Sequence, residues 1–399
     1  MKPELLSPAR DMEQLIMSLT YGADAVYFGA SKFGLRSSAG FIPGELQAAV
    51  DLCHTHDARA YITCNAVLTN DDARELPGFL QELADIGADA VIVSDLGALE
   101  LVKKHAPALD IHISTQAGVM NYETARALHG LGASRIVLAR ELPLAEIARI
   151  RENTPPELAL EAFVHGAMCV SFSGRCLLSN YLTGRDANRG ECAQPCRWKY
   201  HLVEATRPNE YWEISEDGGT YIMNSRDMCM IDHVSDMAAA GITCLKIEGR
   251  MKSFYYAAVV TNAYRRAIDA AEAGMPLADI WRDEVNKVSH RDYSTGFYFD
   301  PNGPGEYHGD AMYFSDCEVC AVVESCDESG NAVLTQRNKF SLGDELELLT
   351  PMDEPVKFIA EDLRDSNGSE LQSAPHPMMR LQLKLPIEAP KYSILRRYK

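Results

Sequence analysis

The chain has 399 residues, 46% of them hydrophobic, and its 57 acidic residues outnumber its 38 Lys and Arg residues. This composition supports a large core and excludes wholesale disorder, and the length suggests two or three domains. The net charge of −19 argues against a surface that binds nucleic acid non-specifically, but a local basic patch is compatible with it.

The N-terminal stretch MKPELLSPARDMEQ lacks the apolar core of a signal peptide. The chain also contains no run of roughly 18 apolar residues, so we expect no membrane span and a cytoplasmic location. Thiols stay reduced in that compartment. The eleven cysteines therefore indicate metal, cluster or redox chemistry rather than structural disulfides.

A short phrase recurs along the first part of the chain. Gly, a small or apolar residue and one polar residue precede a continuous apolar run at Gly22, Gly87 and Gly132, and more loosely at Gly241. Each copy follows a helix-like stretch, so the glycine is expected to end that helix. Continuous apolar runs are typical of strands buried on both faces. The repeat therefore predicts βα units with a parallel sheet.

Eight strands are predicted in this way, which favours an α/β fold of the TIM-type (β/α)8 barrel over residues 1–300. An open, doubly wound sheet is the alternative, weakened because no GxGxxG or Walker motif follows a strand. Residues 164–243 form a long insertion between strands seven and eight, and such insertions are usually functional. The predicted strands are Glu4–Ser7, Ala25–Phe28, Ala60–Cys64, Ala90–Val93, Ile111–Ser114, Arg135–Leu138, Leu158–Phe163 and Cys244–Ile247.

The pattern changes near Asp300. Residues 301–310, PNGPGEYHGD, are rich in Gly and Pro and are predicted to be a linker. After them come short strand-like runs such as CEVCAVVESC and MMRLQLKL, separated by turn signals such as ESGN and SLGD. Residues 311–399 are therefore predicted to form a small all-β, barrel-like domain.

Polar residues follow most of the predicted barrel strands, at the end where TIM barrels carry their active sites. Some could simply cap the next helix, but Arg and Gln are poor caps. Several arginines in one ring suit an anionic small molecule, because guanidinium binds carboxylate through two hydrogen bonds. The candidate substrate-binding residues are Arg36, Asn65, Gln116, Arg140 and Arg250, and the candidate catalytic residues are Glu161, His165, Arg140 and Glu248.

Five cysteines lie in the insertion, among several Gly and Pro residues that would let the backbone wrap around a metal. Four thiolates suit either structural zinc or an iron–sulfur cluster, and the absence of tight CxxC knuckles in the insertion favours the cluster. The other cysteines lie in or beside apolar runs and are expected to be ordinary buried residues. The five are Cys169, Cys176, Cys192, Cys196 and Cys229.

The same insertion interleaves basic and aromatic residues, as single-stranded RNA-binding surfaces do. An ordinary solvated loop is the alternative. The candidate RNA-binding residues are Arg175, Arg185, Arg189, Arg197, Trp198 and Lys199.

The stretch EAFVHGAMCVSFSGRCLLS, residues 161–179, resembles the signature of peptidase family U32. The resemblance continues through NYLTGRDANRGECAQPCRWKY, NSRDMC, KIEGRMKS and SHRDYSTGF, and it covers most of the chain. Within the family, the chain is most similar to the branch that hydroxylates tRNA.

That resemblance implies oxygen-independent formation of 5-hydroxyuridine at the tRNA wobble position, with prephenate as a required metabolite and rRNA as the alternative substrate. It also implies a 4Fe–4S cluster, with zinc as the alternative metal. The implied ligands are Cys169, Cys176, Cys192 and Cys229, with Cys196 as an alternative fourth ligand. The uridine would be flipped out of its stack to reach the site.

Two other functions compete with this one. A collagenase-like peptidase is the literal meaning of the family name, but no HExxH or GxSxG motif is present. A cysteine protease would need Cys169 to pair with His165. The second competitor is a zinc-stapled scaffold that binds RNA without catalysis.

Overall fold

The computed structural model describes residues 2–399 apart from residues 31, 36–39, 199, 201, 204–205, 207–210, 213–224, 301–314 and 352. Arg36, Lys199 and the predicted linker 301–310 therefore lie outside the described residues. Within the described residues no helix is both long and apolar enough to cross a membrane.

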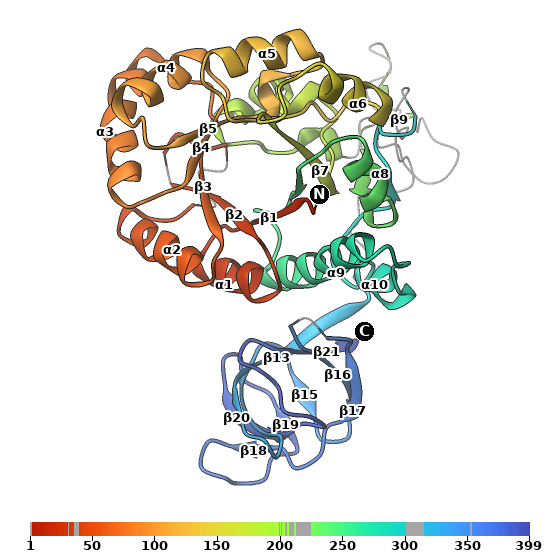
Figure 1. The fold of residues 1–399 in the computed structure, drawn as a ribbon. Helices are drawn as coiled ribbons and strands as arrows, with labels where there is room; N and C mark the ends of the chain where they lie inside the picture. The colour runs from red at the N-terminus through yellow and green to blue at the C-terminus, as the bar shows by residue number, and fades with distance from the viewer. Residues whose placement is uncertain are drawn as a thin grey trace.

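A closed barrel of eight parallel strands forms the first part of the molecule (Figure 1). The ring closes because β11 pairs with β1 on one side and with β7 on the other. The predicted TIM-type barrel is confirmed, and the open, doubly wound alternative is wrong. The barrel strands are β1 (Glu4–Pro8), β2 (Ala25–Gly29), β3 (Arg59–Cys64), β4 (Ala90–Val93), β5 (Asp110–Ile113), β6 (Arg135–Val137), β7 (Ala159–Ala167) and β11 (Cys244–Ile247).

Helices surround the barrel (Figure 1), and the recurring Gly phrase explains how they connect to the strands. Gly22, Gly87, Gly132 and Gly241 all have positive φ, between 77° and 111°, just after a helix and just before a strand. This left-handed conformation ends each helix at little steric cost. The surrounding helices are α1 (Met12–Thr20), α2 (Pro43–Thr55), α3 (Asn70–Asp85), α4 (Leu96–His105), α5 (Tyr122–Gly130), α6 (Leu144–Glu152), α8 (Val234–Ala239) and α9 (Phe254–Glu272).

Strand β7 is longer than predicted, because it continues four residues past Phe163. The added length pairs with β10 (Asp227–Cys229), which runs antiparallel to β7, and β10 in turn pairs with β12 (Tyr293–Ser294). The insertion leaves the barrel after this extension. Its elements are the short helices η2 (Phe172–Gly174), α7 (Leu178–Thr183), η3 (Ala187–Arg189) and η4 (Pro195–Arg197), and the short strands β8 (Leu202–Val203) and β9 (Tyr211–Trp212).

The C-terminal part is an all-β domain, as predicted. Its main sheet has seven antiparallel strands in the order β17-β16-β21-β13-β14-β20-β18, beside the small pair β15 (Phe340–Ser341) and β19 (Ser373–Ala374). Leu334, Leu381 and Leu395 pack in its own core. The seven strands are β13 (Cys317–Cys326), β14 (Asn331–Gln336), β16 (Glu345–Leu349), β17 (Val356–Ile359), β18 (Arg364–Asp365), β20 (Arg380–Lys384) and β21 (Ile394–Tyr398).

The β domain packs against the helices at one side of the barrel, next to α9 and α10 (Asp279–Glu284) (Figure 1). Val319 and Ile394 of the β domain belong to the same apolar cluster as the barrel residues. The Tyr21 hydroxyl, at the end of α1, donates to the carbonyl oxygens of Leu349 and Tyr392 at 3.2 and 3.1 Å. The two domains therefore share buried apolar and polar contacts.

Candidate active site at the barrel mouth

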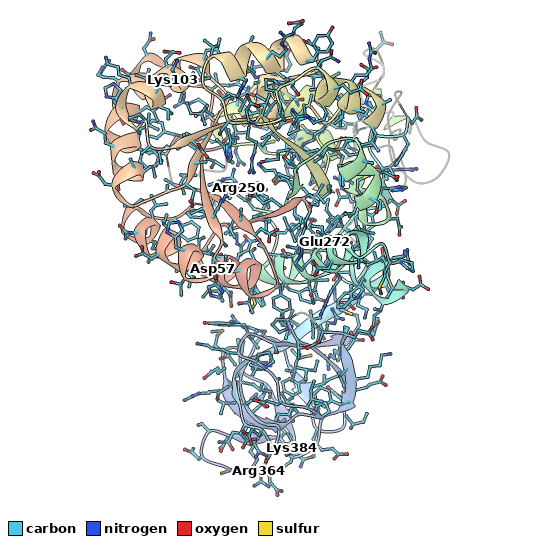
Figure 2. The ribbon with its side chains drawn as sticks, in the orientation of Figure 1. Asp57, Lys103, Arg250, Glu272, Arg364 and Lys384 are labelled. Atoms are coloured by element: carbon cyan, nitrogen blue, oxygen red, sulfur yellow. The ribbon has the colours of Figure 1, made fainter. Side chains whose placement is uncertain are left out.

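A cavity of about 650 Å³ opens at the carboxyl ends of the barrel strands. Residues that follow β3, β5, β6 and β11 line it, and so do residues of the insertion. Arg250, which follows β11, lies near the barrel centre in Figure 2, whereas Asp57, Lys103 and Glu272 lie at the periphery. The volume is typical of a pocket that binds a small-molecule ligand.

The cavity is strongly cationic in an acidic protein. Six cationic side chains and one carboxylate are among the described residues that line it. Of the candidate substrate-binding residues, Asn65, Gln116, Arg140 and Arg250 meet here, as the prediction required. The six cations are Arg140, Arg185, Arg197, Lys246, Arg250 and Lys252, and the carboxylate is Glu248.

Arg140 is held in the cavity by three contacts. Its guanidinium lies over the Phe163 ring at 3.8 Å from the centroid. One Nη donates to the Ala167 carbonyl at 3.0 Å, and the other lies 3.8 Å from a Glu248 carboxylate oxygen. Arg250 is 4% exposed and donates to the Thr63 hydroxyl at 2.9 Å. Both guanidinium groups are therefore held in place before any ligand binds.

Lys246, which sequence reasoning missed, contributes a cation to the cavity from within β11. Its ammonium is 4.3 Å from the Tyr27 ring centroid and 2.8 Å from a carboxylate oxygen of Glu161. The sequence could have revealed this residue, because a lysine in the otherwise uncharged, buried run CLKI is unusual. Lys252 also lines the cavity, and burial lowers its pKa to about 8 although Asp227 opposes the shift.

Glu161, a candidate catalytic residue, does not line the cavity. It is fully buried inside the barrel and bonds Lys246 and Arg135, and Arg135 continues the network to Glu4 at 2.7 Å. Burial alone would raise the pKa of Glu161, but the two cations hold it below its usual value. Glu161 is therefore an ionised partner that orients Lys246, which corrects the predicted catalytic role.

His165 is also a structural residue rather than a catalytic one. It lies inside β7, where Cys229 of β10 is its partner, and it is 1% exposed. Its Nδ1 pairs with the Tyr264 hydroxyl at 3.4 Å and its Nε2 with the Tyr293 hydroxyl at 3.2 Å. Burial lowers its pKa to about 3. His165 lies outside the cavity lining, because β7 extends past the expected strand end and includes it.

The cysteines divide into two groups. Cys169, Cys176, Cys192 and Cys196 all line the cavity, whereas Cys229 does not. Burial raises the pKa of the Cys196 thiol, Arg197 opposes this, and the other three cavity thiols raise it further. Of the two residues that the resemblance allows as the fourth ligand, Cys196 therefore shares the cavity with the other three thiols and Cys229 does not.

Cys229 has a different environment. Its sulfur lies 3.9 Å from the Tyr264 hydroxyl, and burial raises its pKa to about 11 with no other thiol contributing. Cys53, Cys64 and Cys244 are fully buried, as expected of ordinary core cysteines.

Several contacts hold the thiol-bearing insertion against the barrel mouth. The Glu141 carboxylate accepts from the Ser173 amide and hydroxyl at 2.6 and 2.8 Å. The Val67 amide donates to the Asn188 carbonyl at 3.0 Å. Arg189 donates to the carboxylate of Asp72 at 2.5 Å, at the start of α3. These contacts span the loops after β3 and β6, so the insertion is anchored on two sides of the opening.

Zinc and an iron–sulfur cluster require different spacings of the cysteine thiolates that bind them. Within the described part of the chain, the His, Cys, Asp and Glu side chains form no group of three or more that could hold a metal ion. Tetrahedral zinc with Zn–S bonds of about 2.3 Å would bring its thiolates within about 3.8 Å of one another. A cluster that contains its own iron and sulfide atoms needs a wider ring of thiols. Four neighbouring thiols around a roomy cavity fit the cluster better.

The predicted RNA-binding residues differ in their availability. Arg175 and Arg185 are exposed near the thiols, and Trp198 is 44% exposed. Arg189 is engaged with Asp72 and the Val67 carbonyl, so it anchors the insertion instead. Sequence reasoning also missed several exposed apolar side chains of this region. These are Val170, Phe172, Leu177, Leu182 and Met251, beside Tyr181, which is 87% exposed.

Comparison with known proteins places the chain in a family. The model of peptidase family U32 matches residues 10–308, and the model of its C-terminal domain matches residues 315–396. A tRNA hydroxylation protein of Bacillus subtilis (strain 168) is 36% identical over 96% of this chain and 92% of its own length. One of Escherichia coli (strain K12) is 36% identical over 94% and 92%. A 23S rRNA 5-hydroxycytidine synthase of Escherichia coli (strain K12) is 34% identical over 78% of this chain and 45% of that enzyme. The chain therefore belongs to peptidase family U32.

Proposed function

We propose that this protein is an RNA hydroxylase that forms 5-hydroxyuridine at the wobble position of tRNA without using O₂. The observation that carries the proposal is the convergence of four thiols and six cations on one cavity at the barrel mouth. The similarity to tRNA hydroxylation proteins over nearly the whole chain supports RNA, and tRNA in particular, as the substrate. The 34% identity to an rRNA-modifying enzyme makes rRNA the alternative.

The residues around the opening support binding of a looped, single-stranded RNA. Arg175 and Arg185 are exposed cations beside the exposed rings of Tyr181 and Trp198. Cations hold phosphates, and exposed rings stack on unpaired bases. An anticodon loop offers both partners, and a base flipped from it would enter the cavity.

Cys169, Cys176, Cys192 and Cys196 are the residues that would hold a 4Fe–4S cluster. When bound, such a cluster supplies electron-transfer chemistry that the side chains lack. Arg140, Lys246 and Arg250 would bind the carboxylates of a prephenate-type dianion, because they face the same cavity. Arg140 and Glu248 remain the candidate catalytic groups next to that metabolite.

The geometry gives less support to the peptidase. A cysteine protease needs an accessible histidine beside its thiol. His165 is buried, has both ring nitrogens engaged with tyrosine hydroxyls, and lies outside the cavity that Cys169 lines. The zinc-stapled scaffold leaves unexplained why six cations line the cavity that the four thiols share.

The experiment that tests the function uses a host whose own tRNA-hydroxylating gene has been deleted. The wild-type chain should restore 5-hydroxyuridine in tRNA nucleosides measured by mass spectrometry, with or without O₂. Protein purified without oxygen should contain about four irons and four sulfides per chain. Wild-type protein that yields no hydroxyuridine, or that contains zinc and no iron, would refute the proposal.

Matched cysteine variants test the ligand assignment. Cys169→Ala and Cys196→Ala should lose both the iron and the modified nucleoside. Cys229→Ala should keep its iron, and Cys326→Ala in the distant β domain is the control for a harmless thiol substitution. Iron lost from Cys229→Ala but kept in Cys196→Ala would restore the assignment that the family resemblance implied.

A further inference from the structure

The cavity has two chemically different walls. In the barrel order β11-β1-β2-β3-β4-β5-β6-β7, strand β4 lies opposite β11. The loops after β3 and β5, on either side of β4, contribute only neutral polar groups to the cavity: Asn65, Ser114, Thr115 and Gln116. Strand β11 and the loop after it contribute Lys246, Arg250 and Lys252. The Arg250 guanidinium reaches across to Thr63 of β3, whereas Lys246 and Lys252 stay on the β11 side. Arg140 follows β6 and extends over Phe163 of β7 toward Glu248, so it joins the β11 side. We call this side the cationic wall and the loop after β5 the neutral wall.

Gln116 is the most informative residue of the neutral wall. Its side chain lines the cavity and is 3% exposed, yet neither its amide nitrogen nor its amide oxygen has a hydrogen-bond partner. Leaving both a donor and an acceptor unpaired in a buried site is costly. The arrangement is explained by a ligand that offers one donor and one acceptor side by side, and carries no charge.

The cationic wall suits a ligand that carries negative charge. Lys246 is neutralised only in part, because Glu161 also pairs with Arg135. Arg140 stacks on Phe163, with its Nε buried and unpaired. These groups suit an anion with two or more oxygens, since each guanidinium and ammonium retains donors for it.

We propose that the cavity binds two ligands at once, a pyrimidine base against Gln116 on the neutral wall and a small dianion against Lys246 and Arg140 on the cationic wall. This inference deepens the proposed function and rests on it. Uracil presents an N3–H donor beside a carbonyl acceptor, which is the complement of one primary amide. A cavity of about 650 Å³ is large enough for a flipped base and a compact metabolite together.

Part of the insertion lies on the side of the neutral wall. Phe172 of the insertion reaches the loop after β5, where a Cβ built on Gly118 would lie 3.0 Å from the Phe172 ring. Asn188 and Arg189 bind the loop after β3 through the backbone of Val67. These parts of the insertion therefore cover the neutral wall and the loop after β3, and the Cys176 amide lies with them because it donates to the Asn188 side chain at 3.1 Å.

A competition experiment with unaltered protein tests simultaneous binding. The affinity for an anticodon stem-loop RNA is measured with and without saturating prephenate. We expect the affinity to be unchanged or higher with prephenate. If the apparent dissociation constant rises in proportion to the prephenate concentration, the two ligands compete for one site and the inference is overturned.

Two variants then test which wall binds which ligand. Gln116→Met should bind prephenate as wild type does, and should hydroxylate saturating tRNA about tenfold more slowly. Arg140→Met should bind prephenate about tenfold more weakly. If Gln116→Met weakens prephenate binding as much as Arg140→Met does, the division into two walls is wrong. A wild-type protein that binds no prephenate and modifies no RNA would refute the proposed function itself, whatever the variants do.

Discussion

Replacing Arg396 by Met should destabilise the protein by about 3–5 kcal/mol. Arg396 is fully buried in β21, at the contact between the β domain and α10. Its guanidinium donates two bonds to Glu284, at 2.6 and 2.7 Å, and one to Glu347 at 2.7 Å. Methionine fills a similar volume but removes one of two cations, Arg396 and Lys287, that pair with both buried carboxylates. The expected loss of about 3–5 kcal/mol comes from leaving these buried carboxylates without the charge of Arg396.

Urea denaturation at neutral pH measures the free energy of unfolding, and hydrogen exchange in β21 reports whether the domain contact opens first. Arg380→Met is the control, because Arg380 is 64% exposed in its pair with Glu324 and should cost less than about 1 kcal/mol. If the two variants lose equal stability, the buried network does not hold the domains together.

The network also predicts an acid dependence. Burial alone would raise the pKa of Glu347, but Arg396 and Lys287 hold it below its usual value. The stability that this carboxylate contributes is therefore fully present above its unfolded pKa and declines as the pH falls through the folded pKa. The difference in unfolding free energy between wild type and Arg396→Met should shrink below about pH 4.

Two further predictions concern the barrel mouth. Gly166→Ala should fold poorly, because Gly166 has a φ of 107° and an added Cβ would lie 2.3 Å from the Glu248 carbonyl oxygen. Soluble yield and thermal unfolding measure the defect. The control is Gly174→Ala, because there is open space around the Cβ position of Gly174. Binding of an anionic metabolite should weaken as the pH rises through about 8, because burial lowers the pKa of Lys252 to about 8 and its charge is lost above that value. Calorimetric titration of wild type and Lys252→Met between pH 7 and pH 9 checks this, and an equal pH dependence in both proteins would assign the effect to another group.

Most of the barrel could be predicted because its strands are buried on both faces and their sequences are continuously apolar. The end of β7 could not be predicted in this way. His165 and Gly166 look like a loop, and they remain extended because β10, which lies more than fifty residues later, pairs with them. That long-range pairing also determines the positions of His165 and Cys229, neither of which lines the cavity.

The candidate site also depends on contacts between distant segments, which the local sequence does not reveal. The spacing of Cys169, Cys176, Cys192 and Cys196 could identify a thiol-rich insertion, but the convergence of these four depends on anchors elsewhere, such as Glu141 and Asp72. The role of Lys246 depends on its neighbours Tyr27 and Glu161, which come from other strands. Contacts between distant segments, rather than local propensity, decide which polar residues reach the cavity.

The closure of the barrel by β1 and β11 has a consequence for how the chain folds during synthesis. Strand β1 pairs with β11, whose register joins Leu5 to Leu245, so the ring stays open until almost 250 residues have been made. Such a non-local pairing is a slow step, because the loop entropy must be lost before the contact forms. All four cavity cysteines precede β11 in the chain. The insertion can therefore reach its anchors on the growing half-barrel before the last strand completes the ring, and β11 and the loop after it then add Lys246 and Arg250 to a mouth that already holds the four thiols.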